Sequence, residues 1–354
     1  MEGQIDYIYT LKIEKKITKV NYRDIKDAFD AFNEQKILVI GDSMIDSYLW
    51  GDVERISPEA PVPVITKTRR ESRLGGAANV ALNIKALGAE PILASAIGNG
   101  EKAILFKKLL RENHLSKQGI FESNSRSTTI KTRIISHNQH LLRIDEEVNE
   151  PLDPETEEAF LNHLLYIINN EQLSAIVFED YDKGSITPVI IDKIVERAND
   201  KGIPTLVDPK KRNYLLYKNV TLFKPNFKEL VEGLKLDSLE KTDEEGILKA
   251  ARVMHKEQNI QWMMVTLSEA GIFISNGTDS KRIRAKIRDI SDVSGAGDTI
   301  IGIAAVGLAA DLSPWTIAEI SNIGGGQVCE KAGIVPINKE QLLEESRDHI
   351  RWEK

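Results

Sequence analysis

The chain has 354 residues, a net charge of −7 and a single cysteine. This length suits one large α/β domain or two medium ones, and the acidic balance gives no basic footprint for a nucleic-acid partner. One cysteine excludes an intramolecular disulfide and any zinc site built on several cysteines. The first residues hold no apolar signal core and no run reaches spanning length, so we expect a cytoplasmic protein with no membrane partner.

The beginning of the chain is charged and only weakly periodic, and we treat residues 1–35 as an N-terminal extension. Within it, Ile25, Ala28, Phe29 and Phe32 recur at helical spacing and predict an amphipathic helix. The run KILVIGD at 36–42 then predicts a first buried parallel strand.

Similar apolar runs follow, and helical patterns separate most of them. The predicted strands cover 91–98, 175–180, 204–209, 221–226 and 262–268, and the predicted helices cover 78–88, 103–113, 188–200 and 244–257. Strands that alternate with helices favour right-handed βαβ units and a mostly parallel sheet.

Two segments break this alternation because they read as strands without an intervening helix. They cover approximately residues 51–73 and 127–145, and we expect them to form a small antiparallel β lid on the α/β core. No internal repeat or Pro/Gly-rich linker divides the remainder. The sequence therefore predicts one domain over residues 36–350 that carries this lid.

The stretch DVSGAGDTIIGIAAVGLAA, residues 292–310, places a glycine-rich turn before a long apolar helix. Free backbone N–H groups and the helix dipole make such a helix start an anion site. Here Gly295, Ala296 and Gly297 would stabilise a transferring phosphoryl group, and Asp298 would accept a hydroxyl proton. On this stretch alone, a glycine turn with Asp298 as a helix cap is an equally good interpretation.

Two further stretches suit a polyhydroxy ligand. Asp42 and Asp46 follow the first strand, at the end where open α/β sheets bind ligands, and carboxylates accept hydrogen bonds from sugar hydroxyls. Either aspartate could instead cap the next segment. Gly75, Gly76 and Asn79, in RLGGAANVALN, would let the backbone and an amide touch a ligand, or would simply allow tight helix–strand packing.

The segment KPNFKE places Asn226 and Glu229 at helical spacing after a strand. An amide and a carboxylate there could organise hydrated Mg²⁺, or could form an N-cap with a capping-box glutamate. Arg143, Lys183 and Lys210 lie near strand ends or in the lid segments and could bind phosphate, although each alone reads as a surface cation. The sequence contains no P-loop and no dinucleotide fingerprint.

Taken in order, these stretches resemble the ribokinase-like, or PfkB-type, carbohydrate kinase family over about residues 35–345. GGAANVALNIKALG is similar to its N-terminal glycine signature, DVSGAGDTIIGIAAVGLAA to its C-terminal signature, and PNFKE to its N-x-x-E motif. ISPEAPVPV and EDYDKGSIT resemble more closely the kinase part of the heptose-7-phosphate kinase/adenylyltransferase group, which makes the ADP-heptose precursor of bacterial lipopolysaccharide.

The resemblance implies a ribokinase-like three-layer α/β/α fold with a small β lid, and ATP with Mg²⁺ as cofactors. It implies that Asp298 is the general base and that Gly295, Ala296 and Gly297 form the anion hole. It assigns the sugar to Asp42, Asp46, Gly75, Gly76 and Asn79, and Mg²⁺, held indirectly, to Asn226 and Glu229. It places the nucleotide near Ser268, Gly271, Asn322 and Gly326. The second sugar phosphate of the heptose group demands cations, and position and charge select Arg143, Lys183 and Lys210 for it.

This reading predicts a homodimer through the lid and phosphorylation of the anomeric hydroxyl of D-glycero-D-manno-heptose 7-phosphate. No H-x-G-H nucleotidyltransferase motif follows the kinase region, so we expect no adenylyl transfer. The alternatives are another PfkB-type kinase acting on ribose, fructose or fructose phosphate, and a catalytically silent sugar- or nucleotide-binding regulator.

Overall fold

A nine-stranded sheet forms the centre of the protein, in the order β13-β12-β11-β10-β9-β8-β1-β4-β5. The computed structural model describes residues 22–137, 139–331 and 333–350. The strands are β1 (Lys36–Gly41), β4 (Glu90–Ile97), β5 (Gly119–Glu122), β8 (Ala175–Glu179), β9 (Thr205–Asp208), β10 (Leu222–Phe223), β11 (Trp262–Thr266), β12 (Ile272–Ser275) and β13 (Ser280–Ile283).

Neighbouring strands from β5 to β11 are parallel, as the alternation of strands and helices predicted. The last two strands, β12 and β13, add an antiparallel edge. Because the chain runs outward from β1 to β4 and β5 on one side and from β8 to β11 on the other, the strand order reverses between β1 and β8. Open α/β sheets bind ligands at the carboxyl ends of the strands at such a point.

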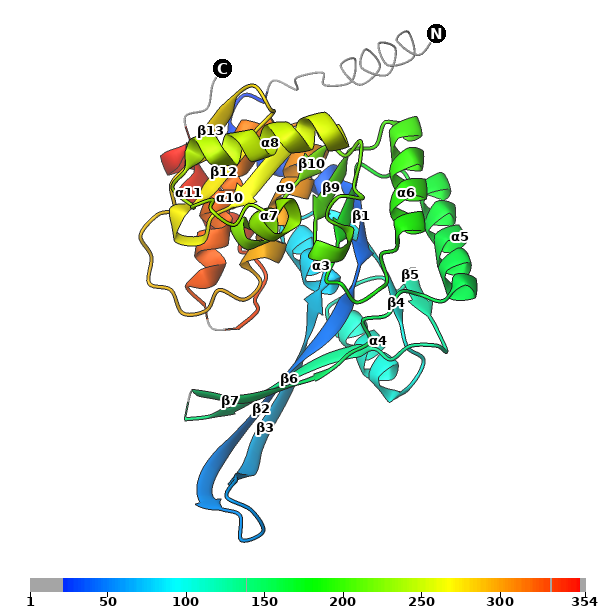
Figure 1. Ribbon diagram of the computed structural model, residues 1–354, viewed down its shortest axis with the longest axis vertical. Coiled ribbons are helices and arrows are strands. Elements are labelled where there is room, and N and C mark those ends of the chain that lie inside the picture. The colour runs from blue at the N-terminus through cyan, green and yellow to red at the C-terminus, as the bar shows by residue number, and fades with distance from the viewer. Residues whose placement is uncertain (1–21, 138, 332, 351–354) are drawn as a thin grey trace.

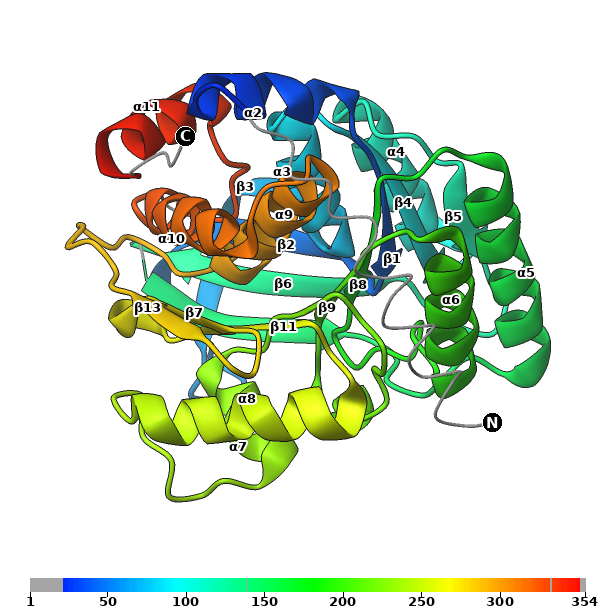
Figure 2. The same cartoon turned by 90° about the horizontal axis from the view of Figure 1, so that it is seen from above.

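Helices cover both faces of the sheet and give three layers (Figure 2). One face packs under α2 (Ile25–Ala31), α3 (Ala77–Ala86), α4 (Glu101–Glu112), α9 (Ala296–Ala309), α10 (Pro314–Cys329) and α11 (Lys339–His349). The other packs under α5 (Pro154–Asn170), α6 (Pro188–Lys201), α7 (Phe227–Leu234) and α8 (Glu244–Gln258). Three short 3₁₀ turns complete the described elements: η1 (Phe32–Glu34), η2 (Lys211–Asn213) and η3 (Ser268–Ala270). None of the helices in the described ranges is long and apolar enough to span a bilayer.

The leading amphipathic helix is present as α2 and continues into η1. Its predicted apolar face, Ile25, Ala28, Phe29 and Phe32, is buried in the same hydrophobic cluster as α3 and α9. Helix α2 is therefore part of the folded core, although the predicted domain boundary after residue 35 assigned it to the extension. Residues 1–21 of the predicted extension lie outside the described residues.

The predicted lid is a separate four-stranded sheet that projects from the α/β body (Figure 1). Its order is β3-β2-β6-β7, with β2 at Ser43–Ile56, β3 at Pro63–Gly76, β6 at Thr129–Ser136 and β7 at Gln139–Glu146. The two hairpins are antiparallel, but they join through β2 and β6, which are parallel. The prediction of an antiparallel lid was therefore wrong for the central pair, because β2 and β6 leave the body in the same direction.

Strand β2 begins at Ser43, directly after β1, so a single residue, Asp42, joins the core sheet to the lid. The lid thus starts earlier than the predicted residue 51. This continuity carries the lid strands to the carboxyl ends of β1 and β8, where most of the predicted site residues lie.

Candidate active site

The site is built around the amino end of α9. Gly295 is the N-cap of this helix and has φ 82, a left-handed conformation that glycine adopts without strain. A Cβ at this position would lie 3.0 Å from the Asn79 amide nitrogen. Glycine therefore allows the turn to approach α3 closely, and it leaves Asp298 in the first helical turn with only 4% of its surface exposed.

Two side chains donate hydrogen bonds to the Asp298 carboxylate, one to each oxygen. Asn79 Nδ2 lies 2.6 Å from Oδ2, and the Tyr181 hydroxyl lies 2.7 Å from Oδ1. Burial raises the pKa of Asp298, and these two hydrogen bonds oppose the shift because they stabilise the charged form. The structure thus brings the predicted Asn79 and Asp298 together and adds Tyr181, which the sequence reasoning missed.

A buried layer of charge lies beneath the glycine turn. Lys224 Nζ and Asp208 Oδ2 are 2.7 Å apart, and both side chains are almost inaccessible to solvent. A Cβ on Gly297 would be 3.8 Å from both atoms, so this ion pair lies against the turn. The sequence reasoning missed both residues, although a charged residue that ends or directly follows a buried apolar strand is a usable signal.

Glu179 is the second acidic group of this layer, at the end of β8 and opposite Asp208 in the sheet register. It is 1% exposed, and its Oε2 has no hydrogen-bond partner among the residues that the structure describes. Burial, reinforced by Asp208 and Asp298, raises the pKa of Glu179 well above its usual value. This environment favours the neutral acid at that position.

Asn226 and Glu229 form the capping box that the sequence left open as an alternative. Asn226 Oδ1 accepts the Glu229 backbone N–H at 2.9 Å, and Glu229 Oε2 accepts the Asn226 backbone N–H at 2.8 Å. The other Glu229 oxygen forms an ion pair with Lys210. Burial and Asp208 raise the pKa of Glu229, while Lys210 and Lys224 oppose that shift.

This donor set fits a magnesium ion that is held mainly by waters and nucleotide phosphates. In the described part of the chain no three His, Cys, Asp or Glu side chains gather closely enough to cage a metal. Mg²⁺ commonly retains several waters and takes few protein ligands in phosphoryl-transfer sites. Asn226 and Glu229 suit an indirect contact of that kind.

The two aspartates after β1 have different surroundings. Asp46 is 2% exposed, forms an ion pair with Arg133 of β6, and lies so close to Gly75 that a Cβ there would overlap it. Asp42 instead accepts backbone N–H groups of Tyr181, Lys183 and Ser185 at 2.9–3.0 Å. Both Asp42 oxygens are therefore engaged by the loop after β8.

A cavity of about 380 Å³ opens between the lid and the start of the glycine turn. Its lining residues are Arg133, His140, Leu141, Leu142, Arg143 and Ser294. Of the three predicted phosphate-binding cations, Arg143 lines this cavity, whereas Lys183 contacts Glu147 and Asn149 and Lys210 contacts Glu229. Each of the three cations therefore has its own carboxylate partner, because Arg143 also pairs with Asp145.

The residues predicted to border the nucleotide surround the segment 284–288. Gly271, with φ 90, ends the η3 turn that begins at Ser268, and it packs against the backbone at residues 283–285. Asn322 Nδ2 donates to the Arg284 carbonyl at 2.9 Å, and Gly326 faces the Arg288 side chain. These four residues lie near one segment, beside α10 and β12.

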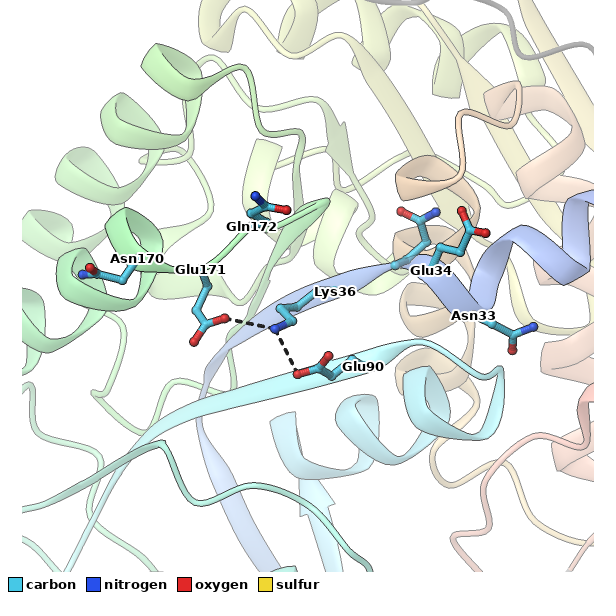
Figure 3. A pocket seen from close by; sticks show the side chains of 8 residues that line it. Asn33, Glu34, Lys36, Glu90, Asn170, Glu171 and Gln172 are labelled. Carbon is cyan, nitrogen blue, oxygen red and sulfur yellow. Dashed lines mark hydrogen bonds and ion pairs between the residues drawn. The ribbon is translucent and has the colours of Figure 1, made fainter.

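A second cavity, of about 470 Å³, lies at the amino ends of the strands (Figure 3). Lys36, the first residue of β1, there contacts Glu90 at 3.2 Å and Glu171 at 3.0 Å. This cavity is polar and is lined by none of the predicted site residues. It also lies at the opposite end of the strands from the end where open α/β sheets bind ligands.

Comparison with known proteins gives consistent findings. The profile described as pfkB family carbohydrate kinase matches residues 34–340. The bifunctional protein HldE of Syntrophotalea carbinolica is 37% identical over 331 residues, which cover 92% of this chain and 66% of that protein. The HldE of Methylobacillus flagellatus is 38% identical over 309 residues, covering 87% and 62%. The chain thus spans about two thirds of the length of the curated relatives it matches.

Solved structures share the fold at low identity. Phosphofructokinase-2 from Escherichia coli superposes with a TM-score of 0.72 at 17% identity and covers 88% of this chain and 99% of its own. Ribokinase of Arabidopsis thaliana, complexed with ribose and ATP, superposes with a TM-score of 0.66 at 15% identity, covering 88% and 99%. The predicted three-layer, mostly parallel fold of this class is confirmed.

Proposed function

The chain belongs to the pfkB family of carbohydrate kinases, and from that premise we propose that it phosphorylates the anomeric hydroxyl of D-glycero-D-manno-heptose 7-phosphate. As a member of this family it is a phosphotransferase with an alcohol group as acceptor. The observation that carries the proposal is the buried Asp298 at the amino end of α9, held by Asn79 and Tyr181 beside the glycine turn.

In the proposed reaction, Asp298 accepts the proton of the sugar hydroxyl. The hydroxyl oxygen then forms a bond to the γ-phosphorus of ATP, the bond from that phosphorus to the β-phosphate oxygen breaks, and ADP leaves. Backbone N–H groups at residues 295–297, with the positive end of the α9 dipole, stabilise the charge of the transferring group. Asn226 and Glu229 would hold the hydrated Mg²⁺ indirectly near the nucleotide phosphates, and the ion would neutralise phosphate charge when bound.

The lid cavity supports an acceptor that already carries a phosphate. It places Arg143 and Arg133 opposite each other in the β6–β7 register and close to Ser294, two residues before the helix that carries Asp298. Arg133 pairs with the buried Asp46, whereas Arg143 forms a bidentate ion pair with Asp145 and its side chain is 58% exposed. Guanidinium groups bind phosphate in a bidentate manner. Arg143 thus supplies an accessible cation at the sugar end of the site.

An ADP-release assay with Mg²⁺-ATP tests the acceptor. The panel contains D-glycero-D-manno-heptose 7-phosphate, sedoheptulose 7-phosphate, fructose 6-phosphate, fructose and ribose. We expect the highest kcat/KM for the manno-heptose phosphate. A preference for fructose 6-phosphate, fructose or ribose would discard the heptose assignment but keep the kinase chemistry, and no turnover with any acceptor would favour a silent regulator.

Arg143→Gln is expected to raise the KM for the heptose phosphate about tenfold, because one charge-assisted hydrogen bond to phosphate is lost. The kcat and the KM for ATP change little, since Arg143 lies on the lid. Arg69→Gln is the matched control: Arg69 is also an exposed lid arginine, but it stacks over Trp50 outside the cavity. Steady-state kinetics measures both variants. An equal change in the KM for the heptose phosphate in the two would show that Arg143 does not bind the phosphate.

We also propose that the protein is cytoplasmic, where ATP is available, and that two copies pair through their lids. Strand β7 is an edge strand exposed along its whole length, and Leu141, Leu142 and Ile144 are 44%, 58% and 45% exposed. An exposed apolar edge strand is an aggregation hazard unless another chain covers it.

A further inference from the structure

The single residue that joins core and lid also holds the loop that follows β8. The Asp42 backbone N–H donates to the Glu179 carbonyl at 3.1 Å, and its carbonyl accepts from Ala77 N at 3.1 Å. Its side chain accepts the N–H groups of Tyr181 and Lys183 on Oδ2 and of Ser185 on Oδ1. Asp42 is 1% exposed, so these bonds do not compete with bulk water.

The loop 181–185 has little freedom to rearrange. Asp182 has φ 57 and Gly184 has φ 85, both in the left-handed region, and a Cβ on Gly184 would overlap the Glu150 carbonyl. The Asp182 N–H also donates to Asp180 Oδ1 at 2.9 Å. A backbone constrained in this way fixes the direction in which the Tyr181 side chain leaves it.

The Tyr181 side chain extends from this loop to Asp298, the proposed base. The Tyr181 hydroxyl reaches Asp298 Oδ1 at 2.7 Å, and its ring lies 5.2 Å from the Lys210 ammonium. Burial and the nearby carboxylates keep the pKa of Tyr181 well above its usual value, so the phenol acts as a hydrogen-bond donor. One chain of contacts therefore runs from Asp42 through the loop to the reacting carboxylate.

We propose that Tyr181 is a positioning residue for the catalytic base, and that Asp42, rather than binding sugar, clamps the loop that keeps the Tyr181 hydroxyl on Asp298. The inference rests on the proposed function, because it takes Asp298 as the base. A base that is already held in its reactive orientation before the substrate binds lowers the barrier of the chemical step.

The direction of the pH effect follows from the groups that face Asp298. These are Asn79 from α3, Tyr181 and Glu179 from β8 and its loop, Asp208 from β9 and Lys224 after β10. The hydrogen bond from Tyr181 lowers the pKa of Asp298, so removing it raises that pKa. The base works only when ionised, and activity is lost as pH falls through this pKa. The acidic limb of the rate profile therefore moves to higher pH.

Tyr181→Phe tests the proposal, because it removes the hydroxyl and keeps the ring beside Lys210. We expect kcat to fall roughly tenfold to a hundredfold, the KM for ATP to stay unchanged, and the acidic limb of kcat/KM to shift to higher pH. Tyr217→Phe is the matched control: this neighbouring buried tyrosine donates to Asp180 at 3.0 Å and does not contact Asp298. It should leave the acidic limb in place.

The outcomes separate this inference from the proposed function. If Asp298→Asn is inactive but Tyr181→Phe shifts neither kcat nor the acidic limb, the positioning role is overturned and the kinase assignment stands. A Tyr181→Phe enzyme with a higher KM for the sugar alone would make Tyr181 a substrate contact and would also overturn it. Normal turnover by Asp298→Asn would show that Asp298 is not the base, which is the assumption on which this inference rests.

Asp42→Asn provides a second and independent test. The amide nitrogen introduced at position 42 is a hydrogen-bond donor, so it cannot accept the N–H groups of the loop. We therefore expect the loop to loosen and kcat to fall. In the Tyr181→Phe background the same change should have much less effect, because the contact through which Asp42 acts is already lost. Additive losses, with urea unfolding showing that each variant is folded, would contradict the coupling between Asp42 and Tyr181.

Discussion

Asp298→Asn is expected to lower kcat by about a hundredfold to ten-thousandfold, the range that a well-placed general base contributes, while ATP binds almost as before. The amide has nearly the shape of the carboxylate but cannot take the proton of the sugar hydroxyl. Its nitrogen would also face Asn79 Nδ2 or the Tyr181 hydroxyl, both of which donate to the native carboxylate. The native pattern of two donors to one carboxylate is therefore lost: either the bond from Asn79 breaks or the Tyr181 hydroxyl turns from donor to acceptor.

Steady-state kinetics and calorimetric titration with ATP check this expectation together. Asp200→Asn, the same substitution at an exposed position of α6, is the control and should behave as the native enzyme. If Asp298→Asn retains normal turnover, another group accepts the proton. A variant that loses ATP binding as well as turnover would instead show that Asp298 supports the nucleotide site.

The sequence was most informative where one local segment determines the structure. The alternation of apolar runs and helical patterns predicted the parallel sheet, and SGAGDT predicted a helix start with a buried aspartate, since both depend on residues close in the chain. The face of α2 was predicted from the spacing of Ile25, Ala28, Phe29 and Phe32 in the same way. Asn79 and Asp298 were each predicted as site residues from their own glycine-rich stretch, whereas the hydrogen bond between them joins residues 219 apart.

The features that were missed depend on contacts between distant segments. Asp42 was read as a candidate sugar ligand from its place after a strand, but its hydrogen bonds to N–H groups about 140 residues later could not be predicted from the residues around it. Nothing near Tyr181 indicates that its hydroxyl meets Asp298, 117 residues away. The parallel pairing of β2 with β6 likewise depends on where two hairpins leave the body, which hydrophobic pattern does not encode.

Lys224→Met is expected to lower the free energy of unfolding by about 3–5 kcal/mol, because it leaves a buried carboxylate without its partner. Burial alone lowers the pKa of Lys224, but Asp208, Glu229 and Glu179 outweigh it and keep that pKa above its usual value, so the ammonium is charged at neutral pH. Its loss leaves Asp208 uncompensated under the glycine turn, with Glu179 beside it.

Urea unfolding of two further variants distinguishes a lost ion pair from lost packing. Lys228→Met makes the same change in an exposed pair with Glu232, where the lysine is 83% exposed, and should cost at most about 1 kcal/mol. Adding Asp208→Asn to Lys224→Met removes the orphaned charge and should recover most of the stability, since a buried ion pair replaced as a whole is often close to neutral. No recovery would mean that Lys224 contributes through the packing of its side chain. Recovery of stability without recovery of kcat would place the Lys224–Asp208 ion pair in the proposed phosphoryl-transfer site, because both side chains lie beneath the glycine turn.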